Sequence, residues 1–96
     1  MAQQVTITTE TSVALKALVE SALQAEVRML DLSLQRTRQR LDAFEQQYNQ
    51  SSQEFEKRFI AGETEESFDF IEWAGELHTY RLLDGQRQAL QGVEVH

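Results

Sequence analysis

Apolar residues recur through most of the chain at alternating steps of three and four, which is the spacing of an amphipathic α-helix. After Thr11 and Ser12, which are good N-cap residues, the pattern runs without glycine or proline to Tyr48. One run of positions, which we name the first stripe, comprises Leu23, Val27, Leu30, Leu34, Thr37, Leu41, Phe44 and Tyr48. Its spacing is typical of a coiled-coil seam and predicts one long helix over residues 12–48.

The first half of this helix is apolar on two faces. A second stripe comprises Leu15, Leu18, Ala22, Ala25, Met29 and Leu32. The second half has only the first stripe, so the first half has more apolar surface to bury against neighbouring elements.

Two further helices are predicted after Asn49, which ends the long one. Ser51 and Glu54 are in capping-box register and predict a short helix over 51–61, which Gly62 is well placed to stop. Ser67 or Thr64 can cap a return helix over 67–91. Its apolar stripe is Phe70, Trp73, Leu77, Tyr80, Leu83, Arg87 and Leu90.

The segment over 4–9 has a different pattern. Val5 and Ile7 alternate with Thr6 and Thr8, which is a short strand pattern of β-branched residues. The chain has no second strand pattern, so this segment is frayed, pairs with a copy of itself, or adds to the edge of a partner's sheet.

Helix lengths limit how the elements can pack. The long helix would span about 54 Å and the return helix about 35 Å, which leaves roughly 20 Å of the long helix uncovered. The uncovered part is the half with two stripes, so either the helix breaks near 31–33 or this half meets another chain. We expect a homodimer, and the candidate interface residues are Val5, Ile7, Leu15, Leu18, Ala22, Leu23 and Met29.

The fold class that follows is all-α. A single domain over 1–96 would contain a long, a short and a return helix, as a coiled-coil-like helical hairpin with a short extended segment at its N-terminus. Aromatic residues at helical spacing are usually core. We expect a hub where the helix ends meet, formed by Leu41, Phe44, Tyr48, Phe55, Phe59, Phe70, Trp73 and Leu77.

Composition narrows the function classes. The formal net charge of −7 favours a basic protein partner over nucleic acid. Arg36, Arg38 and Arg40 are two apart, which favours a solvated helix face over a phosphate site. The absence of cysteine excludes disulfides and thiolate metal sites. The start of the chain does not match a signal peptide and no apolar run is long enough to span a membrane, so we expect a cytoplasmic protein.

Catalytic chemistry has little support. His78 does not form a Glu-x-x-His pair with the neighbouring glutamates, and His96 is terminal. There is no glycine-rich phosphate loop, nucleophile elbow or pair of histidines at metal-binding spacing. We therefore expect no enzymatic activity, no metal and no cofactor.

The block "LDAFEQQYNQSSQEFEKRFIAGETEESFDFIEWAGELHTYRLL" over 41–83 resembles small helical prokaryotic antitoxins, which are often encoded beside a toxin gene. The matching residues are Leu41, Phe44, Glu45, Tyr48, Ser51, Ser52, Glu54, Phe55, Phe59, Gly62, Glu63, Asp69, Glu72 and Trp73. The chain departs from the family pattern at Asn49, where glycine is typical, and at Ala74 and Gly75. The resemblance implies a protein that binds and neutralises a toxin protein.

The acidic residues Glu63, Glu65, Glu66, Asp69 and Glu72 have two interpretations. They can stabilise the start of the return helix through its dipole, or they can form a contact surface for a basic toxin. Two alternative functions stay open, namely a homodimeric helical scaffold or adaptor without an inhibitory role and a DNA-binding regulator. For the regulator, a ribbon–helix–helix fold would need a turn in the long helix and basic residues on the strand, which the sequence lacks.

Overall fold

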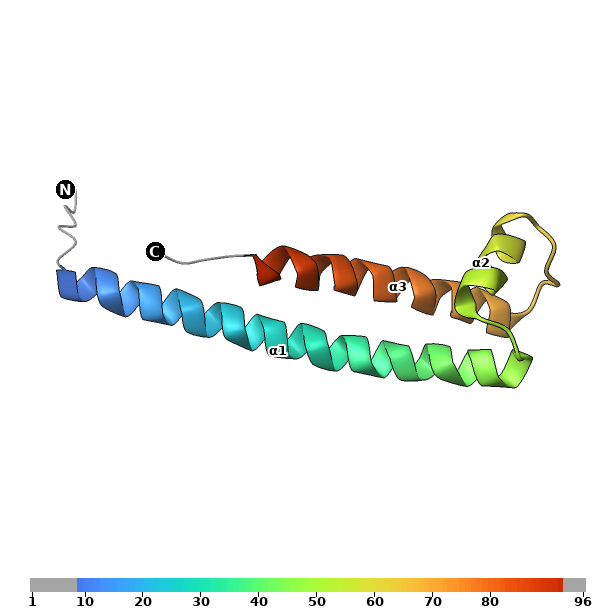
Figure 1. The fold of residues 1–96 in the computed structure, drawn as a ribbon, viewed down its shortest axis with the longest axis horizontal. Helices are drawn as coiled ribbons and strands as arrows, with labels where there is room; N and C mark the ends of the chain where they lie inside the picture. The colour runs from blue at the N-terminus through green and yellow to red at the C-terminus, as the bar shows by residue number, and fades with distance from the viewer. Residues whose placement is uncertain (1–8, 93–96) are drawn as a thin grey trace.

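The computed structural model describes residues 9–92, with side chains described from Ser12 onward. It contains three helices, α1 (Thr9–Tyr48), α2 (Ser52–Ile60) and α3 (Phe68–Gln91). α3 runs back beside the second half of α1, and α2 lies at the end where the chain reverses (Figure 1). Over the described residues there is no strand, and the all-α prediction is confirmed.

The helix boundaries differ from the expected ones by up to three residues. α1 begins at Thr9 rather than at residue 12, so the last residue of the expected 4–9 strand is helical. The rest of that expected strand, including Val5 and Ile7, lies outside the described residues. α2 and α3 lie inside the expected ranges, because Ser51, Ala61 and Ser67 are caps and not helical residues.

Two residues with positive φ end the first two helices. Asn49 has φ 50° and Gly62 has φ 74°. In each case the amide of the following residue donates to a carbonyl in the last helical turn. The Gln50 amide donates to the Glu45 carbonyl at 3.2 Å, and the Glu63 amide donates to the Arg58 carbonyl at 2.8 Å. This is the Schellman arrangement, which favours glycine or asparagine at the left-handed position. Local sequence therefore fixes where the chain leaves α1 and α2.

Serine side chains begin the second and third helices. The Ser51 hydroxyl accepts from the Glu54 amide at 3.1 Å, and the Ser67 hydroxyl accepts from the Phe70 amide at 3.0 Å. Each bond satisfies an amide that has no partner within the helix, a contribution of about 1 kcal/mol. Of the two caps considered for the return helix, Ser67 is the one used.

The core lies at the closed end of the hairpin. Leu41, Phe55, Trp73 and Leu77 are its buried members, from all three helices. Six further residues pack against them, namely Phe44, Tyr48, Phe59, Phe70, Ala74 and Tyr80. All eight residues expected in the hub are in this cluster. The Trp73 indole stacks on the Phe55 ring at a centroid distance of 4.0 Å with the ring planes 1° apart.

α1 extends well beyond α3. The longest axis of the molecule is 64 Å, and α1 continues without interruption through residues 31–33. The ion pairs Arg40–Glu76 and Asp31–Arg87 fix the antiparallel register, so that the end of α3 is level with about residue 27 of α1. About 25 Å of α1 therefore has no neighbouring helix among residues 9–92 (Figure 1). Of the two outcomes considered, a helix break is excluded.

Candidate functional site: the hairpin tip

A buried hydrogen bond joins α2 to α3 at the hub. The indole nitrogen of Trp73 donates to the hydroxyl of Ser52 at 2.8 Å, and both residues are buried. The amide of Ser52 in turn donates to a carboxylate oxygen of Glu45 on α1 at 2.9 Å. Because buried polar groups are costly when unpaired, this chain of contacts fixes the position of α2 relative to both long helices.

Glu45 also pairs with Arg38, about two turns earlier on α1. Arg38 donates to Glu45 at 3.0 Å and to Asp42 at 2.9 Å, and its guanidinium lies 5.8 Å from the ring centre of Tyr80 on α3. Burial raises the pKa of Glu45, but hydrogen bonds from Ser52 and Arg38 outweigh burial, so the pKa lies below its ordinary value of 4.5. The ionised carboxylate is therefore part of the folded corner.

We expect a Glu45→Gln variant to lose about 1 kcal/mol of stability at pH 7, because it loses the charge-assisted bond to Arg38. The lowered pKa of Glu45 contributes stability above the unfolded pKa, and this contribution disappears as the pH falls below about 4.5. The difference in unfolding free energy between wild type and variant should therefore shrink from pH 6 to pH 3. Urea titrations at several pH values measure it, with Glu20→Gln on the exposed part of α1 as the control. If the difference in unfolding free energy between wild type and Glu45→Gln were the same at pH 3 as at pH 6, the lowered pKa of Glu45 would be contradicted.

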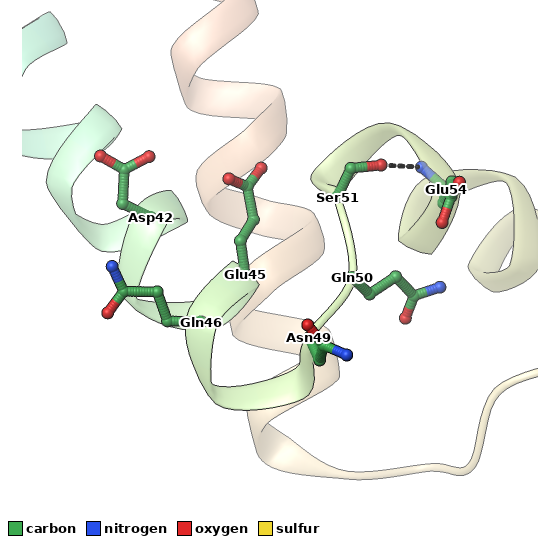
Figure 2. Close-up of a pocket in the computed structure, with 7 residues that line it drawn as sticks. All are labelled: Asp42, Glu45, Gln46, Asn49, Gln50, Ser51 and Glu54. Carbon is green, nitrogen blue, oxygen red and sulfur yellow. Dashed lines mark hydrogen bonds between the residues drawn. The ribbon is translucent and has the colours of Figure 1, made fainter.

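A shallow polar hollow follows the α1–α2 corner. Figure 2 shows its lining residues, which come from the last turns of α1, the connecting turn and the start of α2, with the Ser51 cap bond dashed. They are Asp42, Glu45, Gln46, Asn49, Gln50, Ser51 and Glu54. The hollow is lined by acids, amides and one hydroxyl, with no large apolar side chain to anchor a protein partner.

The tip of the hairpin has a different character. Ile60 at the end of α2 is 77 % exposed, and Phe68 and Ile71 in the first turn of α3 are 90 % and 60 % exposed. Large apolar side chains in one region of a surface are a feature of interaction sites. We name these three residues, together with the exposed acids of the same region, the tip surface.

Four of the five acids singled out in the sequence belong to this surface. Glu63, Glu65, Glu66 and Glu72 are exposed. Asp69 is half-buried, and its carboxylate accepts from the Tyr48 hydroxyl and from the Gln47 amide at 3.4 Å. The bond to Asp69 raises the pKa of Tyr48. Asp69 therefore already serves the contact between α1 and α3, and the other four carboxylates are the ones that can face a partner.

A hollow of about 490 Å³ lies within the tip surface. Phe59, Gly62 and Ile71 line it together with the link residues 64–67. Its lining thus combines apolar side chains with the acidic residues Glu65 and Glu66. Gly62 leaves open space here, since an added Cβ would meet no atom within 4 Å. The combination can hold an apolar or long cationic side chain.

The candidate interface residues on α1 are separate from the tip. Leu15, Leu18 and Met29 are 54 %, 66 % and 66 % exposed, and Ala22 is exposed too. Leu23 belongs to the first stripe and is half-buried. The second stripe thus remains exposed along its length, even where α3 runs beside α1, except for the half-buried Ala25.

The arginines of the basic segment are largely used within the hairpin. Arg38 pairs with Asp42 and Glu45, and Arg40 pairs with Glu76 at 3.5 Å. Only Arg36 of the three has no ion pair within residues 12–92. A phosphate backbone would have to compete with these internal carboxylates.

Sequence reasoning missed Ser52 and the apolar part of the tip. Phe68 and Ile71 fall outside the α3 stripe that includes Phe70 and Trp73, and this offset in the pattern could have marked them as outward-facing. The capping-box register marked Ser51 as the cap, but nothing in the sequence indicated a buried role for Ser52.

Among residues 9–92, no helix is both long and apolar enough to cross a membrane. In the same part of the chain, no three side chains of the types that commonly bind metal come together. Comparison of the sequence with protein-family models, with curated proteins and with solved structures returned no match.

Proposed function

We propose that the protein is a non-catalytic, homodimeric binding protein of the cytoplasm that neutralises a basic toxin protein, in the manner of an antitoxin. The observation that carries the proposal is the tip surface, where Ile60, Phe68 and Ile71 are exposed and where Ile71, Glu65 and Glu66 line a hollow. Exposed apolar anchors beside a group of carboxylates are typical of a site for a basic protein.

The hub explains why the tip could bind with little loss of entropy. Both ends of the segment between α2 and α3 are fixed, one by the Schellman turn at Gly62 and the other by the Ser67 cap. A preorganised surface avoids part of the ordering cost that a flexible loop would incur on binding. The resemblance over residues 41–83 covers this same hub and tip, which supports the antitoxin-like assignment.

A homodimeric scaffold without an inhibitory role is the second candidate, and the exposed second stripe favours it. Both candidates use that stripe for self-association, but only the first requires the tip to bind a partner. A DNA-binding regulator has less support, because Arg38 and Arg40 already pair with acids and α1 has no turn.

Co-expression tests the proposed function. We expect a neighbouring gene to encode a small basic protein whose expression alone stops growth, and we expect growth to return when this chain is co-expressed. At limiting expression, Phe68→Ala should rescue poorly, because removal of an aromatic anchor from an interface typically weakens binding at least about tenfold.

Leu82→Ala is the matched control for this experiment, since Leu82 is also exposed on α3 but lies away from the tip. It should rescue as well as wild type. If no neighbouring product is toxic, or if both variants rescue equally, the antitoxin proposal is wrong, and the scaffold becomes the better account.

A further inference from the structure

The second stripe of α1 is an apolar face that nothing within residues 9–92 covers. Its six residues are Leu15, Leu18, Ala22, Ala25, Met29 and Leu32, of which Leu18 and Met29 are each 66 % exposed. The side chains that pack against the first stripe come from α2 and α3, and they leave this face open. The stripe lies about 120° around the helix from the first stripe, at 100° per residue.

The order of side-chain sizes along the stripe is the same in both directions. Two large residues precede Ala22 and Ala25, and two large residues follow them. A twofold interface needs such self-complementarity, because the same patch is presented by both subunits. If the second copy is antiparallel, Leu15 faces Leu32, Leu18 faces Met29, and Ala22 faces Ala25. The two small residues then permit close approach at the centre.

Charge distinguishes this arrangement from a parallel one. Arg36 and Arg40 continue the second stripe by one and two further turns. In a parallel dimer in register, Arg36, which has no ion pair within residues 12–92, would face its own copy, which is unfavourable. The parallel arrangement would also bring the two acidic tips to the same end, whereas the antiparallel arrangement puts them at opposite ends.

We propose that a second copy of this chain covers the second stripe with its own second stripe, antiparallel and with its twofold axis between Ala22 and Ala25. This inference rests on the self-association in the proposed function and specifies its geometry. Contact from Leu15 to Leu32 extends over about 27 Å of helix and would bury roughly 1,000 Å² in all. That area is near the lower limit for a specific interface, so we expect a weak dimer.

Cysteine cross-linking tests the register, because the chain contains no cysteine of its own. Leu18→Cys and Met29→Cys chains that carry different tags are oxidised separately and as an equal mixture of full-length proteins. The antiparallel register predicts at least about fivefold more disulfide between the two variants than within either one. Leu82→Cys on α3, mixed with either variant, is the control and should show no such preference.

One other outcome would overturn the antiparallel register. If the yield of disulfide within Leu18→Cys and within Met29→Cys equals the yield between them in the mixture, the dimer is parallel or the cross-links arise from random collision.

Sedimentation of wild type, Leu18→Glu and Met29→Glu across micromolar concentrations tests self-association separately. Wild type should shift towards a dimer and the glutamate variants should stay monomeric with unchanged helicity, because both side chains are exposed in the single chain. A wild type that is monomeric throughout would contradict self-association itself, whatever happens at the tip.

Discussion

Replacement of Trp73 by alanine is expected to lower the free energy of unfolding by about 4 kcal/mol, the largest effect of any single substitution we anticipate. The indole is fully buried, stacks on Phe55, and lies 5.6 Å from the Phe44 ring centre at an interplanar angle of 10°. Its removal would leave a large cavity and would also deprive the buried Ser52 hydroxyl of its donor. A loss of this size is a large fraction of the total stability of a small domain.

Urea unfolding followed by circular dichroism measures this effect. Trp73→Phe is the control that separates packing from hydrogen bonding, because it keeps an aromatic ring and loses the indole donor. We expect this variant to cost about 2 kcal/mol, mainly from the lost indole hydrogen bond to Ser52 and a smaller ring. A Trp73→Ala variant within 1 kcal/mol of wild type would show that the hub does not hold the hairpin together.

The second large effect is expected at Leu41, whose side chain is also fully buried in the hub. Leu41→Ala should cost about 3 kcal/mol, from lost burial and the residual cavity. Leu82→Ala makes the same chemical change at a position that is 55 % exposed, and it should cost less than about 1 kcal/mol. The ratio of the two losses in the same urea assay tests where the core lies, and equal losses would be incompatible with the described packing.

Local signals in the sequence were sufficient for the elements and the hub. The left-handed residues Asn49 and Gly62 and the caps Ser51 and Ser67 act within one helical turn, so short-range pattern reasoning can identify them. The hub was predictable because its members recur at helical spacing on three elements that must meet. The start of α1 at Thr9 was not predicted, because the β-branched alternation before it resembles a strand.

The candidate site was only partly predictable. Acidic residues at the start of a helix look alike in a sequence, whether they stabilise the helix or face a partner. Only packing reveals that Asp69 is engaged by Tyr48 while Glu72 is exposed. Likewise the buried role of Ser52 depends on the position of the Trp73 nitrogen, which is 21 residues away in the sequence.

The uncovered half of α1 follows from length alone, and the structure strengthens this conclusion. A helix of 40 residues cannot be covered by one of 24, and no break intervenes at residues 31–33. The open second stripe and the tip surface are then two separate exposed regions, and we propose that the first binds a second copy and the second binds a partner.

The central claim is that the tip binds a basic partner protein, and calorimetric titration tests it most directly. The basic product of the neighbouring gene would be titrated with wild type, Phe68→Ala and Leu82→Ala. Our account predicts a Kd at least tenfold weaker for Phe68→Ala and unchanged for Leu82→Ala. Equal Kd values for all three proteins, or no binding by wild type, would contradict it.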